Sequence, residues 1–377
     1  MAKIKVLQSI SSLGVGGNEI FVMNLLRHID KTKFQIDFVV YDNQRLDFYD
    51  EVLEAGGKVY FCQSNHQNKG FKLLNQIGMV KKILKDNKYD IIHCNSCSLF
   101  GILRGTIAGK SIGNIKVIAH SHNLGTPKNT LGDKLVRTIL KKYLCSTIDY
   151  GFSCSDVAGE SKYTKRFMKS SAYYTINNAI EIEKYIYSDT ERNSIRTNMN
   201  IDDSTFVIGH VGRFEKQKNH KFIIDIFEKI LDKRSNSKLL LVGDGSLLNE
   251  IKDYANKKQI GDQIIFAGQQ DNVSVFYSAM DCFLLPSLYE GFPFVLVEAQ
   301  INGLKCIISD NITKSVNIAD GVCFWGLEQD EESWADHVIE FGNYRLNKEQ
   351  ILKVTNMYDI NIEIKKIEEL YQQLMEN

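Results

Sequence analysis

Short apolar runs of strand length alternate with longer amphipathic runs along the first 180 residues. The apolar runs occupy residues 4–10, 36–40, 59–62, 91–94, 117–120 and 151–154. Nearly continuous apolar runs separated by helical patterns are typical of parallel strands that are covered by helices on both faces. The pattern therefore predicts an α/β domain over residues 1–180.

The same alternation begins again after a polar, helix-like stretch at residues 183–200. Its strand-like runs occupy residues 206–211, 239–242, 264–267, 282–285, 306–309 and 322–325. A chain of 377 residues is also long for a single hydrophobic core. We therefore predict an α/β protein with two doubly wound domains, 1–180 and 181–360, followed by a helix at 361–377 that has one apolar stripe.

Composition describes an ordinary globular protein, with 44% hydrophobic and 24% charged residues. No run of about 18 apolar residues is present to span a bilayer, and the amino-terminal residues lead directly into a strand rather than a signal peptide. These features predict a cytoplasmic protein. The eight cysteines fit a reducing compartment. Cys94 and Cys97 form a C-x2-C pair, but without a second pair of ligands this spacing is weak evidence for a metal or redox site.

Charge is distributed unequally along the chain although the net charge is zero. Residues 1–180 contain 25 Lys and Arg against 14 Asp and Glu, so the remaining residues have an equal excess of negative charge. Much of the positive excess lies in the helix-like segments 128–142 and 162–169. The first interleaves cations with leucine and isoleucine, which is compatible with peripheral contact with an anionic membrane. A solvated face over a domain core explains the pattern equally well.

Residues 286–298 carry the most specific chemical signal of the chain. The sequence predicts a buried strand, a Gly-Pro turn that contains Glu290, and a helix from Phe294 that contains Glu298. Backbone N–H groups near Phe294 and Val295 have no partner inside the helix and can bind an anion. Two carboxylates beside such amides suit a nucleoside diphosphate sugar, whereas the alternative is a structural helix with two unrelated glutamates.

The segment resembles the E-x7-E motif of retaining GT-B glycosyltransferases of family 4. The resemblance implies two Rossmann-like domains that face an interdomain cleft, with acceptor binding in the first domain and donor binding in the second. It also implies that the helix at 361–377 crosses back to the first domain. It implies that Glu290 contacts the donor sugar and that Glu298 holds the ribose hydroxyls. The amides of Phe294 and Val295 would meet the diphosphate.

Two motifs of the first half resemble the same family. Gly16 and Gly17 lie after the first strand and resemble its G-G-x-E loop, which faces the donor diphosphate and the acceptor. Position 19, where a dinucleotide-binding G-x-G-x-x-G fingerprint that starts at Gly14 needs its last glycine, is Glu, so the loop does not match that fingerprint. His122 resembles the histidine of the family's His-Asp pair, which approaches the donor sugar, but Asn123 replaces the aspartate. A purely structural turn and a purely structural histidine are the alternatives.

The second half carries further matches. Arg213 and Lys218 resemble the G-R-x4-K segment, and fixed cations there would stabilise the departing diphosphate. Gly243 and Gly245 resemble the G-x-G turn beside the nucleotide. Gly268 lies in a segment that resembles the wall where backbone groups meet the base.

These features lead to one functional hypothesis. The chain would transfer a sugar from a nucleoside diphosphate donor, with UDP as the commonest carrier in the family, to a saccharide or lipid-linked saccharide. The opening loop and the sequence around His122 resemble the capsule and exopolysaccharide branch. No D-x-D sequence is present, so we expect no metal and no other cofactor. A sugar-nucleotide epimerase and a catalytically silent partner of another transferase are the alternatives, and no nucleic-acid-binding module is recognisable.

Overall fold

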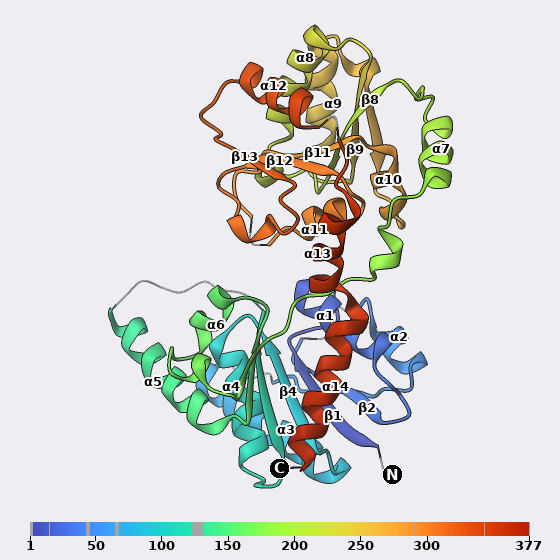
Figure 1. The fold of residues 1–377 in the computed structure, drawn as a ribbon. Helices are drawn as coiled ribbons and strands as arrows, with labels where there is room; N and C mark the ends of the chain where they lie inside the picture. Colours follow the sequence, from blue (N-terminus) through green and yellow to red (C-terminus); the bar gives the residue numbers. More distant parts are fainter. Residues whose placement is uncertain are drawn as a thin grey trace. The chain divides into compact units, whose positions relative to one another are not determined.

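The computed structural model describes residues 3–14, 16–42, 46–64, 68–122, 131–290, 292–342 and 344–376. The chain folds into two compact units (Figure 1). Unit 1 comprises residues 1–180 together with 360–377, and unit 2 comprises residues 181–359.

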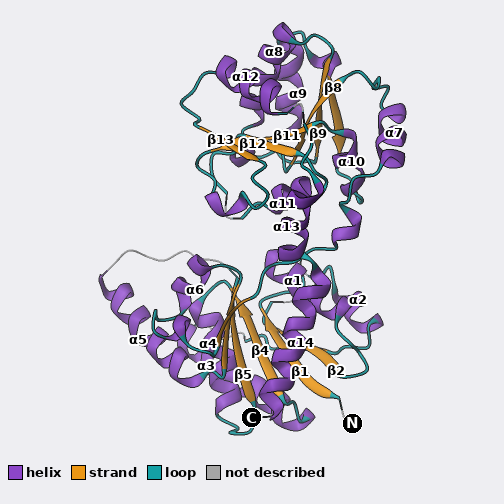
Figure 2. Cartoon of the chain, viewed as in Figure 1, coloured by secondary structure: helices purple, strands orange, loops and turns teal. Residues whose placement is uncertain are grey.

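Unit 1 is built on a parallel sheet of seven strands in the order β3-β2-β1-β4-β5-β6-β7. Helices cover both faces of this sheet (Figure 2). The strands are β1 (Ile4–Ile10), β2 (Phe34–Val40), β3 (Val59–Phe61), β4 (Ile91–Ser96), β5 (Lys116–Ser121), β6 (Tyr150–Ser153) and β7 (Tyr173–Thr175). The helices are α1 (Gly17–His28), α2 (Tyr49–Glu54), α3 (Lys69–Asn87), α4 (Leu99–Lys110), α5 (Leu131–Thr147), α6 (Asp156–Lys162) and α14 (Ile360–Glu376), with a 3-10 turn η1 (Phe167–Lys169).

Unit 2 has a second parallel sheet, with six strands in the order β10-β9-β8-β11-β12-β13. The strands are β8 (Phe206–Val211), β9 (Ser237–Val242), β10 (Ile264–Gly268), β11 (Cys282–Leu285), β12 (Lys305–Ser309) and β13 (Val322–Trp325). The helices are α7 (Asp189–Asn198), α8 (His220–Lys233), α9 (Leu248–Lys257), α10 (Ser274–Ala279), α11 (Phe294–Ile301), α12 (Glu331–Phe341) and α13 (Lys348–Tyr358). Short 3-10 turns are η2 (Ile182–Lys184), η3 (Lys216–Lys218), η4 (Gly261–Gln263) and η5 (Lys314–Val316). The two doubly wound sheets confirm the predicted fold class.

The carboxyl-terminal helix α14 belongs to unit 1. Its apolar stripe, which includes Ile364, Ile367 and Leu370, joins the same buried cluster as β1, β2 and α1. The backbone N–H of Ile360 donates to the carbonyl oxygen of Ile180 at 3.1 Å. Residues 180 apart in the chain therefore meet where α14 begins. Helix α14 forms part of the same hydrophobic core as β1.

Helix α5 exposes part of its apolar stripe. Leu135 and Ile139 are 64% and 58% exposed, and Val136 and Tyr143 are also exposed. The carboxyl-terminal half of the stripe is anchored by Leu144, which is fully buried. No helix within the described ranges is both long enough and apolar enough to cross a membrane.

Local structure differs from the sequence pattern in two places. Strand β7 has only three residues, Tyr173–Thr175, which are too few to show an alternating or continuous apolar pattern. The helix expected over 183–200 instead begins at Asp189, because the Ser188 side chain accepts the N–H of Glu191 and caps it there. Residues 182–184 form the separate 3-10 turn η2.

Candidate functional site

Three loops at the carboxyl edge of the unit 2 sheet are hydrogen-bonded to one another. Gly212 donates its N–H to the carbonyl of Val242, and Gly243 donates to the carbonyl of Gly268. Gly243 has a φ of +140°, and a Cβ there would lie 2.2 Å from the carbonyl oxygen of Gly212. Only glycine fits so close to a neighbouring backbone, which explains the G-x-G sequence physically. Gly268 ends β10 with a φ of +70°.

A pocket of about 520 Å³ opens above these loops. Its walls include Arg213, Gly243, Gly245 and Gln269. The Arg213 side chain is exposed and makes no ion pair with any residue that the structure describes. A cation beside a wall of glycine backbone is suited to a phosphate-bearing ligand.

Lys218 and Glu290 form a largely buried ion pair in unit 2. Lys218 Nζ lies 2.7 Å from Glu290 Oε1, and the two side chains are only 14% and 7% exposed. Gln217 donates from Nε2 to the other carboxylate oxygen at 3.0 Å. Its carbonyl also accepts the N–H of Leu288. The loop before α8 and the loop after β11 are therefore joined by both backbone and charge.

Glu298 lies one turn into α11 and lines a second pocket, of about 620 Å³. Tyr277 donates its hydroxyl to Glu298 Oε2 at 2.6 Å. Burial raises the pKa of Glu298, while hydrogen bonds from Tyr277 and Tyr185 oppose that rise. Val295 lines the same pocket, and the helix begins at Phe294 after Pro293. The first turn thus presents free amide groups near a carboxylate that is held in place by a tyrosine.

The two pockets are adjacent because both are lined by Val211 and Val273. Arg213 lies at one of them and Glu298 at the other. Ligands of open α/β sheets bind at the carboxyl ends of the strands. An elongated ligand with a phosphate end and a polyol end fits this chemistry.

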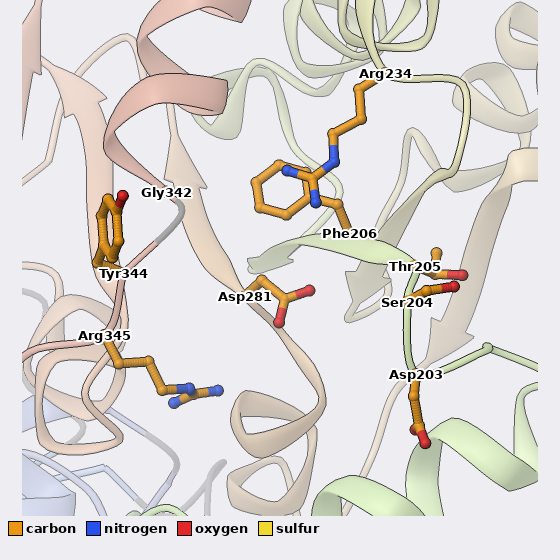
Figure 3. Close-up of a pocket in the computed structure, with 9 residues that line it drawn as sticks. All are labelled: Asp203, Ser204, Thr205, Phe206, Arg234, Asp281, Gly342, Tyr344 and Arg345. Carbon is orange, nitrogen blue, oxygen red and sulfur yellow. The ribbon is translucent and has the colours of Figure 1, made fainter.

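A smaller pocket of about 180 Å³ lies at the opposite edge of the same sheet, where β8 and β11 begin (Figure 3). Its polar groups are occupied by structural contacts. Asp281 accepts hydrogen bonds from Arg192 at 2.7 Å and Arg196 at 2.8 Å, and Arg345 donates to the carbonyl of Met280. These arginines bind the carboxyl end of α10 and hold the start of the sheet together, which indicates a structural role.

In unit 1, Gly16 and Gly17 lie where β1 turns into α1. Gly16 is the N-cap residue of α1. A Cβ on Gly16 would lie 2.5 Å from Glu19 Oε2, whereas a Cβ on Gly17 would meet nothing within 4 Å. Glu19 itself accepts a hydrogen bond from the Ser12 hydroxyl at 3.2 Å. A side chain at position 16 would therefore collide with Glu19, whereas there is space for one at position 17.

His122 follows β5 at the carboxyl edge of the unit 1 sheet. Its ring lies 4.0 Å from that of His120 and 5.0 Å from that of Phe21 on α1, measured between centroids. Nε2 of His122 lies 3.0 Å from Oδ1 of Asn95. Burial lowers the pKa of His122 to about 3, so the imidazole is neutral at physiological pH. Asn123 lies outside the described residues.

The structure thus groups the candidates into two sets, one in each unit. Sequence reasoning missed the residues that hold them: Gln217 on Glu290, Tyr277 on Glu298 and Asn95 on His122. Period-two alternation along β4 places Asn95 on the same face as His93, and this was the signal in the sequence that could have identified it. None of the eight cysteines forms a disulfide among the residues that the structure describes. Within the described ranges, no group of three or more His, Cys, Asp or Glu could hold a metal.

Two family models match successive parts of the chain. "Glycosyltransferase Family 4" matches residues 15–183, and "Glycosyl transferases group 1" matches residues 191–353. The chain belongs to the GT-B glycosyltransferases of family 4. The two matches divide close to the boundary between unit 1 and unit 2.

Several bacterial glycosyltransferases match this chain over nearly its whole length. EpsF of Bacillus subtilis is 28% identical, over 93% of this chain and 91% of that protein. The UDP-Gal:alpha-D-GlcNAc-diphosphoundecaprenol alpha-1,3-galactosyltransferase of Escherichia coli is 26% identical, over 92% and 90%. The capsular polysaccharide biosynthesis glycosyltransferase CapH of Staphylococcus aureus is 24% identical, over 98% of each chain. This family 4 glycosyltransferase is therefore related to enzymes of capsule biosynthesis.

The fold is also shared with a solved structure. HepE of Anabaena, crystallised in complex with UDP, superimposes with a TM-score of 0.76 at 15% identity, covering 99% of this chain and all of that one. At this identity the match establishes the GT-B fold and no more.

Proposed function

We propose that this glycosyltransferase moves a sugar from a nucleoside diphosphate donor to a saccharide or lipid-linked saccharide, with retention of the anomeric configuration. The observation that carries the proposal is the carboxyl edge of unit 2. There a glycine-walled pocket with Arg213 adjoins a pocket with Glu298, and the same unit holds the Lys218–Glu290 pair. The UDP of HepE and the UDP-galactose and diphosphoundecaprenol in the name of the E. coli relative favour a UDP-sugar and a lipid-linked acceptor.

The residues take distinct roles in this proposal. Unit 2 binds the donor and unit 1 the acceptor. Glu298 binds the ribose hydroxyls, and the amides of Phe294 and Val295 meet the diphosphate. Arg213 and Lys218 stabilise the negative charge that develops on the leaving group. Gly243, Gly245 and Gly268 form the wall along the nucleotide.

The reaction centre would use Glu290 and His122 to position the donor sugar, with Gly16 and Gly17 leaving room for the ligands. The bond between the anomeric carbon and the phosphate oxygen breaks, and a bond to the acceptor oxygen forms on the same face. The acceptor proton passes to the leaving phosphate. We expect no requirement for a divalent ion, because cations and helix amides supply the positive charge; loss of purified activity in EDTA would contradict this.

The decisive experiment measures release of nucleoside diphosphate from a panel of UDP-sugars. The wild-type protein should release UDP slowly without acceptor and faster with one. Lys218→Ala should lower the rate by at least about 100-fold. Lys216→Ala is the matched control, because Lys216 is exposed on the same 3-10 turn. No release from any donor would favour the silent-partner alternative, and formation of an epimeric sugar nucleotide would favour the epimerase.

Membrane contact through α5 is a separate part of the proposal. The exposed apolar side chains Leu135 and Ile139 lie on a helix that also carries Lys134, Lys141 and Lys142. This combination suits the surface of an anionic bilayer. Leu135→Ser/Ile139→Ser should reduce co-sedimentation with phosphatidylglycerol vesicles at low salt, whereas Leu352→Ser, an equally exposed leucine of unit 2, should not. Equal binding of all three proteins would remove α5 from the proposal.

A further inference from the structure

A buried chain of hydrogen bonds runs from the carboxyl-terminal helix to the candidate catalytic histidine, entirely within unit 1. Asn95 Nδ2 lies 2.8 Å from Gln8 Oε1, and Gln8 Nε2 lies 3.2 Å from the hydroxyl of Tyr371 on α14. The Tyr371 hydroxyl lies 2.7 Å from His93 Nδ1. At the other end, Asn95 Oδ1 lies 3.0 Å from Nε2 of His122.

One backbone group fixes the direction of this chain. The carbonyl oxygen of His93 lies 3.2 Å from Asn95 Nδ2, and a carbonyl oxygen can only accept. The amide nitrogen of Asn95 must therefore face His93 and Gln8, and its oxygen must face His122. Turning the amide over would place two oxygens in contact.

The same direction holds along the rest of the chain. Gln8 accepts from Asn95 with its oxygen and so donates to the Tyr371 hydroxyl, which leaves the hydroxyl proton free to be donated to His93 Nδ1. His93 is neutral, because burial lowers its pKa to about 3. When Nδ1 accepts from Tyr371, the single ring proton of His93 sits on Nε2, which lies 3.2 Å from Nδ1 of His120. The amides of Asn95 and Gln8 therefore each have one fixed orientation, and the contacts of Tyr371 and His93 are compatible with it.

Tautomer selection at His122 follows from this direction. Its Nε2 faces an oxygen that can only accept, so Nε2 carries the proton. A neutral imidazole has one N–H, which leaves Nδ1 as a bare acceptor. That atom is buried and has no hydrogen-bond partner among the residues that the structure describes. A buried acceptor without a donor is uncommon and calls for an explanation.

We propose that Asn95, oriented by Gln8 and Tyr371, holds His122 as the Nε2–H tautomer, so that Nδ1 accepts a hydrogen bond from a hydroxyl group of the bound sugar. This rests on the proposed role of His122 at the donor sugar. Asn95, Gln8 and Tyr371 are positioning residues, since they act only through His122. His122 then neither protonates nor deprotonates the substrate; it fixes the position of a hydroxyl.

The test is long-range ¹H–¹⁵N correlation of histidine side chains at pH 7, with the His122 signal assigned by its loss in His122→Gln. The wild-type protein should show the Nε2–H pattern. An Nδ1–H or imidazolium pattern would overturn the inference whether or not the enzyme is active. The wild-type spectrum requires no variant of the network to fold.

Two variants test the network itself. Asn95→Leu removes the acceptor and should populate the Nδ1–H tautomer. Tyr371→Phe should shift the tautomer population less, in the same direction, because Asn95 Nδ2 still donates to the carbonyl oxygen of His93. Tyr163→Phe is the matched control: it removes two buried hydrogen bonds to the carbonyls of Ala119 and Phe152, and should leave the tautomer unchanged. An unaltered His122 signal in Asn95→Leu would refute the role of Asn95.

Turnover provides the second readout. In Asn95→Leu, kcat for UDP release should fall about tenfold while the KM for the donor changes by less than about threefold, because positioning rather than binding is lost. Wild-type turnover in Asn95→Leu would refute the positioning role. If instead His122→Gln kept wild-type turnover while the Nε2–H pattern was observed, the role of His122 in the proposed function would fail and the tautomer assignment would stand.

Discussion

The ion pair between Lys218 and Glu290 makes a quantitative prediction about both stability and turnover. Replacing Lys218 by Met removes the ammonium group that lies 2.7 Å from a carboxylate only 7% exposed. Loss of one partner from a buried pair costs about 3–5 kcal/mol. Here Gln217 still donates to Glu290 and the lysine is partly exposed, so we expect a loss of about 2 kcal/mol in the free energy of unfolding.

Glu290→Gln should cost less, about 1 kcal/mol, because the amide oxygen still accepts from Lys218. The double variant should be more stable than the sum of the two single losses implies, with a coupling energy of about 1 kcal/mol. Both single variants should also lower kcat for UDP release by about 100-fold, since each group would act on the reacting sugar or its leaving group.

Tryptophan fluorescence in urea measures the stability of unit 2 by itself. The chain has two tryptophans, and both lie there: Trp325 ends β13 and Trp334 is buried in α12. Lys216→Met serves as the control for a lost charge on the same turn. Single-variant losses below about 0.5 kcal/mol, with additive effects in the double variant, would show that the pair contributes nothing to stability.

Three further predictions concern other buried polar groups. Glu298→Gln should weaken donor binding yet leave the protein at least as stable as the wild type at pH 7. Burial raises the pKa of Glu298 in the folded protein, so the contribution of its protonated form to stability is lost as pH rises above the unfolded value of 4.5. The stability advantage of the variant should therefore shrink as pH falls towards 4.5. His220→Phe should make unit 2 less sensitive to acid, because burial lowers the pKa of His220 to about 4. The stability of the wild type should drop by up to about 1.4 kcal/mol per pH unit below 6.5. Parallel pH profiles of stability for the wild type and the variant would refute this. Asp281→Ala should lower the free energy of unfolding by about 3–5 kcal/mol, because it leaves Arg196 buried without its carboxylate partner. Asp336→Ala, at an exposed pair with Lys233, should change stability by less than about 0.5 kcal/mol. Equal losses in the two variants would contradict the structural role of Asp281.

Periodicity was sufficient to predict the two sheets because the strands inside each sheet, such as β1, β4, β8 and β11, are buried on both faces and therefore appear as apolar runs. It failed at Tyr173–Thr175, where three residues at the sheet edge need no such run. The E-x7-E segment was recognisable because helix-start amides and acidic residues have a fixed local spacing. The supporting groups were not: Tyr277 meets Glu298, and Asn95 meets His122, only through the packing of separate elements. Contacts of that kind depend on tertiary structure, which no local spacing encodes.

The position of α14 has a consequence for how the protein is made. Unit 1 buries Ile364, Ile367, Leu370, Tyr371 and Leu374 of α14 against its first strands and helix, so its core is incomplete until α14 has left the ribosome. Domains generally fold in order from the amino terminus during synthesis. Here unit 2 is completely synthesised before unit 1 can close its core. A nonsense codon that deletes only the final helix would therefore damage the beginning of the protein and leave its middle intact.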